Sequence, residues 1–318
     1  MNIKEIQEFF VKEGINEDLR GKDAVLQELE RRKKNYASLD ANKKEYYDIE
    51  SLTNPYYDSK ILNGNPETEV KTVMVGIDIE TPEILLAKQL INSGKKIDLI
   101  IAHHPEGYAY SNFHEVINVQ TGIVSKLGVP VNAAEKLISS RVREVRRSIL
   151  PQNNDRTTDA AKLLEIPLMT AHTVADNHVA SFLQREIDAL KPVYIKDITD
   201  YLNSLTEYKY SSKAGLAPTL FFGSEDSLCG KVFVDMTGGT EGPVEMFEQL
   251  AAAGVGTIVS MHLGQKAVKE AEKYHINILI AGHISSDNLG LNLLFDKLEA
   301  KYGNIDFVEA SGFRRFRR

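Results

Sequence analysis

Residues 71–105 read KTVMVGIDIETPEILLAKQLINSGKKIDLIIAHHP, in which two apolar runs flank a helical pattern. The first run, Val73 to Ile77, is rich in β-branched residues, which predicts a buried strand. The TPE that follows at 81–83 supplies a cap, a first-turn proline and an acid for a helix to about Asn92. Asp98 to Ala102 is the next expected strand. This order indicates a right-handed βαβ unit in a largely parallel sheet.

The same alternation continues toward the C-terminus. Further strands are expected at Val129 to Val131 and Ile166 to Ala171, with a long helical stretch from Ala134 between them. From residue 231 the rhythm repeats as KVFVDM, PVEMFEQLAAAG, GTIVSM, QKAVKEAEKY, NILIAG and DNLGLNLLFDKLEAKYG. VFVDMTGG resembles VMVGIDIE, and TIVSMHLG resembles LIIAHHPE, which favours a weak internal duplication, although regular folding gives such similarity too.

The predicted fold class is α/β, with two similar lobes of mixed, largely parallel sheet flanked by helices. Residues 63–195 are expected to form the first lobe and residues 196–318 the second. Residues 1–62 are expected to form an N-terminal helical extension, because Ile3, Ile6, Phe9 and Phe10 recur at helical spacing and a charged periodic run follows.

Composition narrows the classes of function. The 318 residues carry 45 acidic and 38 basic side chains, a formal charge of -7 that disfavours nucleic acid as a partner. The basic runs RVREVRR at 141–147 and FRRFRR at 313–318 are the exceptions, and we interpret the second as a solvated or subunit-packing tail. A weaker hypothesis is that these two runs bind nucleic acid.

Cysteine and hydropathy restrict the compartment and the type of metal site. Cys229 is the only cysteine, which excludes an intrachain disulfide and a cysteine-rich zinc site. Any metal must therefore be held by imidazole and carboxylate. No stretch approaches the roughly 20 apolar residues of a spanning helix, so no membrane association and a cytoplasmic location are expected.

Histidines gather just beyond the expected strands. His103, His104, His172, His262 and His283 all follow a strand's C-terminal end, the edge where open α/β sheets bind ligands. Pro105 holds His104 extended and stops a helix, which lets both neighbouring imidazoles turn into one crevice. The alternative, about equally favoured for this pair alone, is one structural and one exposed histidine.

Two pairs repeat a spacing of four residues, His172 with Asp176 and His283 with Asp287. On a helix this spacing stacks both side chains on one face, as when one helix supplies two metal ligands. The alternative is that each aspartate caps a helix N-terminus. Taken together with the histidine pair, these pieces predict a site for two divalent cations, with carboxylates to bridge and imidazoles to complete each shell.

The set DLIIAHHPEG, AHTVADN and ILIAGHISSDNLGLNLL resembles the GTP cyclohydrolase I type 2 family, also called Nif-three-like. The resemblance covers most of the chain from about Lys60, and MNIKEIQEFF is similar to that family's N-terminus. It implies two lobes with a dinuclear metal site between them and a homo-oligomer, usually a ring-shaped hexamer.

Carried over from the family, the metal ligands are His103, His104, Asp176, His283 and Asp287. The family normally has glutamate at the last position, and the longer segment between His104 and His172 is a second departure. The resemblance leaves the ions open among Zn, Mn and Fe.

Two further histidines are candidates for catalysis. His172 is either a ligand or a residue that orients one by hydrogen bonding, with the second slightly favoured. His262 is either a proton shuttle or substrate contact, or a surface histidine. TGGTEGP at 237–243 follows a strand and offers amides to an anion such as phosphate, although a tight turn is the commoner explanation.

The main functional hypothesis is a metal-dependent hydrolase acting on a small phosphorylated or nucleotide-like substrate through an activated water. In the alternative, the ions have no catalytic role and hold the lobes of a regulatory or scaffold protein together.

Overall fold

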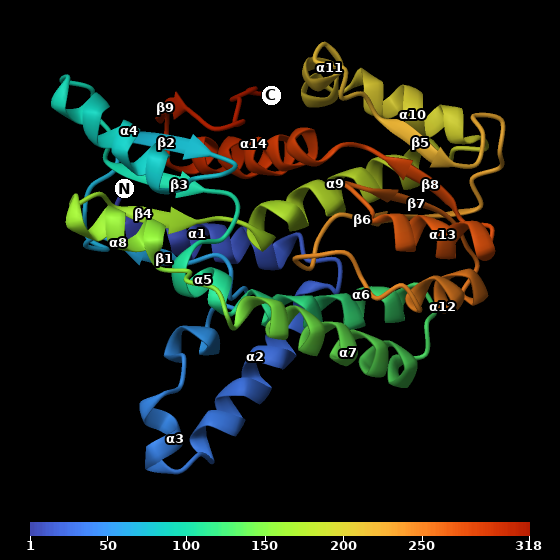
Figure 1. Cartoon of the computed structure of the whole chain (residues 1–318), viewed down its shortest axis with the longest axis horizontal. Helices are drawn as coiled ribbons and strands as arrows, with labels where there is room; N and C mark the ends of the chain where they lie inside the picture. Colours follow the sequence, from blue (N-terminus) through green and yellow to red (C-terminus); the bar gives the residue numbers. More distant parts are fainter.

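The computed structural model describes residues 1–318 and contains two separate sheets (Figure 1). The first has the order β1 (Ile61–Asn63), β4 (Leu168–Thr170), β3 (Leu99–Ala102), β2 (Thr72–Gly76) and β9 (Asp306–Glu309). The second has the order β5 (Thr219–Phe222), β8 (Asn277–Ile280), β7 (Val255–Ser260) and β6 (Lys231–Asp235). Only β1 and β5 run antiparallel to their neighbours. The predicted α/β class with two largely parallel sheets is confirmed.

Both sheets use one topology. An antiparallel edge strand comes first along the chain in each, and three parallel strands then follow in reverse spatial order, as β1-β4-β3-β2 and β5-β8-β7-β6. This common order agrees with the internal duplication suggested by VMVGIDIE and VFVDMTGG. β2 therefore corresponds to β6, β3 to β7 and β4 to β8.

Helices cover both sheets and fill the space between them. The N-terminal segments are α1 (Ile3–Asn16), α2 (Lys22–Ala37), α3 (Ala41–Glu45) and the 3-10 turn η1 (Ile49–Leu52). Those in the first half are α4 (Thr81–Asn92), α5 (Gly107–Ser111), the 3-10 segment η2 (Phe113–Asn118), α6 (Val119–Lys126), α7 (Val131–Ile149), α8 (Arg156–Leu163) and α9 (Thr173–Leu190). The remaining helices are α10 (Ile195–Ser204), α11 (Thr206–Ser212), α12 (Met246–Ala252), α13 (Gln265–Lys273) and α14 (His283–Tyr302). None combines the length and the apolar character that a membrane span requires.

Helices α9 and α14 pack against each other in the middle of the molecule (Figure 1). Gly290 of α14 makes their closest approach possible, because a Cβ there would lie 2.5 Å from the carbonyl oxygen of Ala175 in α9. Asp176 follows Ala175 directly, and Asp287 lies nearly one turn before Gly290. The contact between the two helices thus brings the two acids together.

The division into residues 1–62, 63–195 and 196–318 stays a prediction, and two segments cross it. Helix α1 buries Ile3, Ile6 and Phe10 in the same apolar core as Phe295 of α14. Strand β9, from the C-terminal end, pairs in parallel with β2 of the first sheet.

The strand expected at Val129 to Val131 does not form. Val129 instead closes the end of α6, donating its backbone N–H to the Val124 carbonyl, and Pro130 is the N-cap of α7. The apolar Val-Pro-Val sequence therefore packs a turn between two helices, because proline provides no N–H for a strand ladder.

The interpretation of FRRFRR as a solvated tail holds only for Arg317 and Arg318, which are exposed, and subunit packing stays a prediction. Phe313 is fully buried, and the Arg315 guanidinium donates to Asp296 at 2.5 Å and to Glu299 at 2.7 Å. Both acids lie on α14. The tail folds onto its own chain because this helix presents carboxylates to it.

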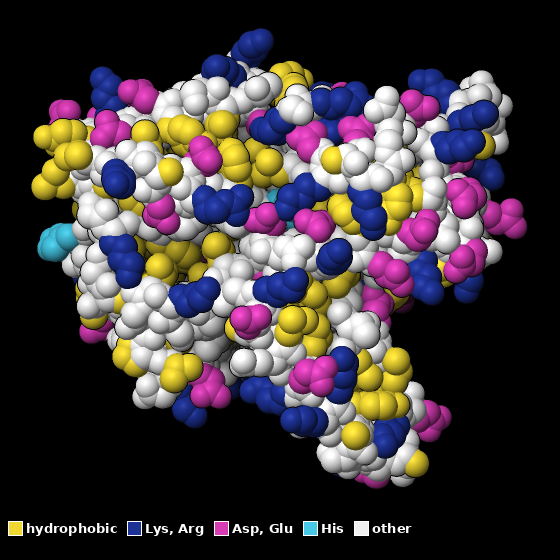
Figure 2. All heavy atoms as spheres, turned by 180° about the vertical axis from the view of Figure 1, so that it is seen from behind, with side chains coloured by type: hydrophobic (Ala, Val, Ile, Leu, Met, Phe, Trp, Pro, Cys, Tyr) yellow, Lys and Arg dark blue, Asp and Glu magenta, His cyan; other side chains and the backbone are white.

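Helices α2 and α3 project from the body as an arm, comprising residues 22–53 (Figure 1). Helix α2 buries only Val25 and Leu29, and Tyr46 beyond it is 85% exposed. Viewed from behind, the arm shows hydrophobic side chains beside Lys and Arg side chains (Figure 2). None of the metal-ligand candidates lies on the arm.

The close approach of α9 and α14 predicts that Gly290→Ala destabilises the protein. The added Cβ meets a backbone oxygen that cannot move aside, and overpacking of this kind costs about 1–3 kcal/mol. Urea unfolding would measure the loss, with Ala300→Ser at an exposed position of the same helix as control. A Gly290→Ala variant as stable as the control would contradict this description of the helix contact.

Candidate metal centre

The six histidine and aspartate candidates come from three strand ends, two in the first sheet and one in the second. His103 and His104 follow β3, His172 follows β4, and His283 begins α14 a short turn after β8. Helix α9 begins at Thr173 with His172 as its N-cap residue, and α14 begins at His283 after Gly282. Asp176 and Asp287 therefore lie inside their helices, and the alternative that they are N-caps is wrong.

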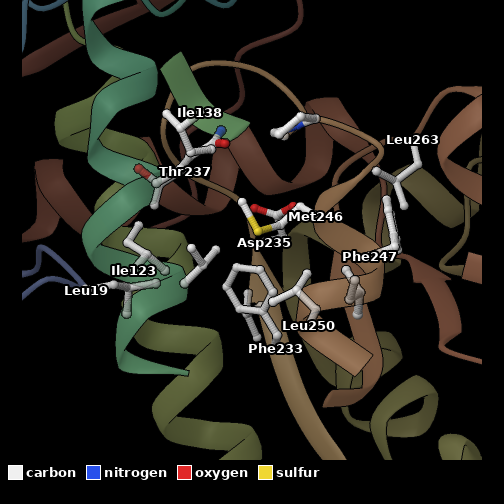
Figure 3. Close-up of a pocket in the computed structure, with 16 residues that line it drawn as sticks. Leu19, Ile123, Ile138, Phe233, Asp235, Thr237, Met246, Phe247, Leu250 and Leu263 are labelled. Carbon is white, nitrogen blue, oxygen red and sulfur yellow. The ribbon is translucent and has the colours of Figure 1, made fainter. Parts of the chain in front are cut away.

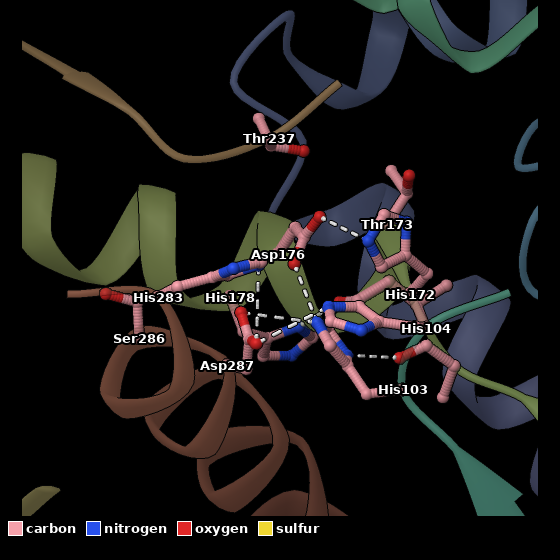
Figure 4. Close-up of polar contacts among 12 residues, drawn as sticks. His103, His104, His172, Thr173, Asp176, His178, Thr237, His283, Ser286 and Asp287 are labelled. Carbon is pink, nitrogen blue, oxygen red and sulfur yellow. Dashed lines mark hydrogen bonds and ion pairs between the residues drawn. The ribbon is translucent and has the colours of Figure 1, made fainter. Parts of the chain in front are cut away.

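The imidazoles surround the two carboxylates (Figure 4). His103 Nε2 lies 3.4 Å from Asp176 Oδ1 and 3.4 Å from Asp287 Oδ1. His104 Nε2 and His283 Nε2 each lie 3.6 Å from Asp287 Oδ2, and His172 Nε2 lies 3.7 Å from Asp176 Oδ2. The structure thus brings all five predicted ligands, together with His172, into one cluster.

These contacts are too long for good hydrogen bonds. His103 Nε2, Asp176 Oδ1 and both carboxylate oxygens of Asp287 are buried without any hydrogen-bond partner. Leaving one such atom unsatisfied costs about 1–3 kcal/mol, and more when the group is charged. A cation between the nitrogen and oxygen atoms satisfies them at once, so the donor set fits a metal ion, and three overlapping triads within the cluster have the spacing to hold one.

Three of the imidazoles are oriented by a second hydrogen bond through Nδ1. His104 pairs with Asp78 at 2.6 Å, His172 with Asp58 at 2.7 Å, and His103 with the Ala171 carbonyl at 3.1 Å. An acceptor at Nδ1 fixes the proton there and leaves the Nε2 lone pair directed into the cluster. This is the arrangement that metal-ligating histidines use.

Asp58 is the most enclosed of these outer partners. Its carboxylate is fully buried and also accepts the hydroxyls of Thr173 at 2.7 Å and Ser59 at 3.1 Å. Burial alone would raise the pKa of Asp58, but His172 and these hydroxyls lower it. Asp58 lies within residues 1–62, so the N-terminal segment contributes directly to the centre.

The pKa values within the cluster show how strongly the carboxylates attract positive charge. Burial opposes protonation of His103, yet Asp287 and Asp176 hold its pKa well above the usual value. Burial likewise opposes the charge of Asp287, and His103, His283 and His104 keep its pKa below the usual value. Without a metal, a proton on His103 takes the position between the acids, so metal and proton compete there.

One side of the cluster opens into a cleft. The side chains of His104 and His283 are 26% and 39% exposed, whereas those of Asp287 and His103 are 0% and 1% exposed. The cleft is lined by His172, Asp176, Asp235, Thr237, Gly239, Thr240, Glu241, His262, His283 and Asp287, with others. His262 follows β7, is exposed, and has its ring centroid 4.8 Å from that of His283.

The loop at 237–243 is a wall of this cleft and not the start of a helix. Gly238 and Gly239 have φ of +94° and +84°, and Arg141 donates to the Glu241 carbonyl at 3.2 Å. The first arginine of the basic run at 141–147 therefore supports the loop. The backbone N–H groups of Gly239 and Glu241 make no hydrogen bond within the chain.

Asp58, Asp78 and Asp235 were missed by the sequence reasoning. Asp78 directly follows the first quoted strand, so its position after VMVGI was a usable indication. Asp58 lies in a turn, 114 residues from His172 along the chain, and no spacing rule connects the two. His114, His178 and His275 lie outside the cluster. His178 donates to the Val174 carbonyl of its own helix, and burial lowers its pKa to about 4.

Solved structures with this architecture are known. A NIF3 superfamily protein from Sphaerobacter thermophilus has a TM-score of 0.70 and 29% sequence identity, over 81% of this chain and 92% of that chain. Reduced HcgD from Methanocaldococcus jannaschii has a TM-score of 0.47 and 16% identity, over 79% and 88% of the two chains. TTHA1606 from Thermus thermophilus has a TM-score of 0.45 and 17% identity, over 80% and 89%. No protein-family model and no curated protein matches the sequence.

Fold and site together define an α/β protein of two topologically matched sheets with a histidine and aspartate cluster that is able to hold metal. The likeness to the Sphaerobacter protein extends over most of both chains. This likeness supports a NIF3-like family member, in agreement with the sequence resemblance. The ligand assignments, the hexamer and the cytoplasmic location remain predictions.

The hydrogen bond from His172 to Asp58 predicts that Asp58→Asn weakens metal binding. An amide accepts less strongly and can present N–H to the imidazole, and such outer partners are worth about 10- to 100-fold in metal affinity. Titration of metal-free protein with Zn²⁺ or Mn²⁺ measures the change.

Asp98→Asn is the matched control for this variant. The Asp98 carboxylate accepts the N–H groups of Lys71 and Thr72 at the opposite end of the same sheet. It should lose stability without losing metal affinity. Equal metal affinity in the Asp58→Asn variant and the wild type would show that Asp58 does not orient a ligand.

Proposed function

We propose that this protein binds two divalent metal ions and is a metal-dependent hydrolase of small phosphorylated or nucleotide-like substrates. The observation that carries the proposal is the set of four buried, unpartnered donor atoms facing one another at His103, Asp176 and Asp287. Two of the triads able to hold an ion share Asp287: His104, His283 and Asp287, and His103, Asp176 and Asp287. Together they contain the five ligands that the family resemblance implied.

In this proposal Asp287 would serve both ions, because its two oxygens face different histidines. Oδ1 faces His103 and Oδ2 faces His104 and His283. Asp287 replaces the glutamate usual in the family, and the close approach of α14 to α9 at Gly290 offsets its shorter side chain. When bound, paired divalent cations lower the pKa of a water and polarise a substrate oxygen.

The exposure of the cluster favours catalysis over the scaffold alternative. A structural site closes its ligand shell, whereas a catalytic one leaves a coordination position open to solvent. His104 and His283 are both partly exposed, and the cleft beside His283 has room for about 40 Å³. A substrate therefore has a route to that side of the site.

The 237–243 loop supports an anionic substrate. The free N–H groups of Gly239 and Glu241 belong to the cleft wall, where they are able to donate to phosphate oxygens. His262 lies on the open side, which suits a substrate contact or proton shuttle. His172 is held by Asp58 and faces Asp176, which suits it to orient or ligate a metal.

The dinuclear site predicts that His103→Ala and Asp287→Ala each lose bound metal. Elemental analysis of the purified proteins measures the metal, and a panel of phosphoesters and amides measures hydrolysis. Activity should fall by about a hundredfold or more, because metal stabilisation of a transition state is worth several kcal/mol. His275→Asn, at an exposed histidine with φ of +57°, is the control, since asparagine tolerates that conformation.

Two results would change the conclusion. Full metal content in both variants would overturn the site itself. Metal loss in the variants, combined with no metal-dependent hydrolysis by the wild type, would replace the hydrolase with the scaffold alternative.

A further inference from the structure

Asp235 is the last residue of β6 and lies at the same sheet edge as His262 and His283. It pairs in register with Ser260, two residues before His262 on β7. β8, next in the sheet, leads to His283. The ends of three neighbouring parallel strands thus direct a carboxyl and two imidazoles toward one cleft.

The Asp235 carboxyl has no partner. Among the hydrogen bonds and ion pairs of the protein, none involves its side chain, whereas Asp58 and Asp78 are each paired with a histidine. It is not needed to hold the fold together. A half-buried acid without a structural partner, at the edge where ligands bind, is a candidate for chemistry.

Asp235 lies between two hollows. On one side is the cleft beside the metal cluster. On the other is an apolar cavity of about 30 Å³ whose walls include Phe233, Met246, Phe247 and Leu250 (Figure 3). No other charged side chain lines that cavity. The carboxyl therefore has an apolar wall behind it and the cleft in front of it.

This environment favours the protonated carboxyl. Burial and the negative charge of Glu241 raise the pKa of Asp235 to about 7. The other titratable groups on the cleft wall are His172, Asp176, His262, His283 and Asp287. No lysine or arginine lines either hollow, so no cation offsets the penalty of burial.

We propose that Asp235 is the general acid of the hydrolysis, donating its proton to the leaving group; this role rests on the proposed function. An oxygen of water forms a bond to the electrophilic atom of the substrate, and the bond to the leaving oxygen or nitrogen breaks. That atom keeps the bonding electron pair and takes the proton of the Asp235 carboxyl. The attacking water gives up one proton to solvent, and the resulting carboxylate takes one proton back from solvent before the next turnover, so one water is consumed in all.

The leaving group provides the sharpest test. A 4-nitrophenyl phosphoester needs no proton to depart, whereas an alkyl phosphoester does. Asp235→Asn should lower kcat/KM for the alkyl ester by about 10²- to 10⁴-fold and change that for the nitrophenyl ester far less. Asp235→Glu should recover part of the loss, and metal content should equal that of the wild type in both variants.

Glu241→Gln tests the electrostatic argument. Without the neighbouring charge the pKa of Asp235 falls, so the loss of kcat/KM with rising pH should occur at lower pH than in the wild type. The amide oxygen is still able to accept the Gly264 N–H that Glu241 accepts now at 2.8 Å. An unmoved pH profile would overturn the assignment of that limb to Asp235.

Unfolding of the metal-free protein gives a readout independent of activity. Between the ordinary aspartate pKa of 3.8 and about 7, the folded state holds the Asp235 proton more tightly than the unfolded state. Stability from this group is therefore full below that window and is lost as pH rises through it. Asp235→Asn should gain stability relative to the wild type across the window, and Asp306→Asn, at an exposed carboxyl, should not.

Equal losses for both leaving groups, or no pH-dependent stability difference in Asp235→Asn, would overturn the role of Asp235. A wild type without any metal-dependent hydrolysis, combined with the expected stability difference, would instead overturn the proposed function and with it the catalytic role, while leaving the raised pKa established.

Discussion

The centre depends on one imidazole held between two carboxylates. His103 Nε2 is 3.4 Å from an oxygen of Asp176 and 3.4 Å from an oxygen of Asp287, and all three groups are almost completely buried. Two buried acids repel each other unless positive charge lies between them. The acids come from different helices, so the packing of α9 on α14 and the charge at the centre are coupled. A cation at this point, proton or metal, would lie between α9 of the first half and α14 of the second.

The surroundings of the cluster determine which cation suits it. Asp58, Asp78 and the Ala171 carbonyl accept hydrogen bonds at Nδ1 of three histidines, so the other nitrogen of each ring faces inward. A proton satisfies one or two of the inward donor atoms, whereas a divalent ion satisfies several. The buried atoms without partners are therefore explained by metal coordination better than by any set of protons. Asp58 also explains why the N-terminal segment is part of the centre.

The sequence was sufficient for the fold class and for the cluster, because both follow from local patterns. Apolar runs with caps and proline identified the βαβ units, and His-x-x-x-Asp after a strand identified two corners of the site. Asp58 and β9 could not be found in this way, since their partners are remote in sequence and depend on tertiary packing. The strand predicted at Val129 to Val131 was wrong for the opposite reason. These residues resemble a strand locally, but in the structure they lie at the turn between α6 and α7. The contacts of the C-terminal tail with its own chain were not predicted, because composition does not reveal that its arginines meet acids on α14.

The two sheets share a topology but not their chemistry. The position that Asp235 occupies at the end of β6 corresponds to Gly76 at the end of β2, since Gly76 pairs with Ala102 as Asp235 pairs with Ser260. A Cβ on Gly76 would lie 2.5 Å from Ile79 Cδ1, so a side chain there would require the Ile79 side chain to shift. The first sheet instead places His103 and His104 after β3, where the second has Met261 and His262 after β7. Both halves supply cation ligands, since His283 and Asp287 follow β8 of the second sheet, but only the second half adds a free acid and an exposed imidazole at its strand ends. Asp235 and His262 therefore line the same cleft as the ligand candidates His283 and Asp287, so the proposed hydrolysis would find proton-transfer groups beside the cations.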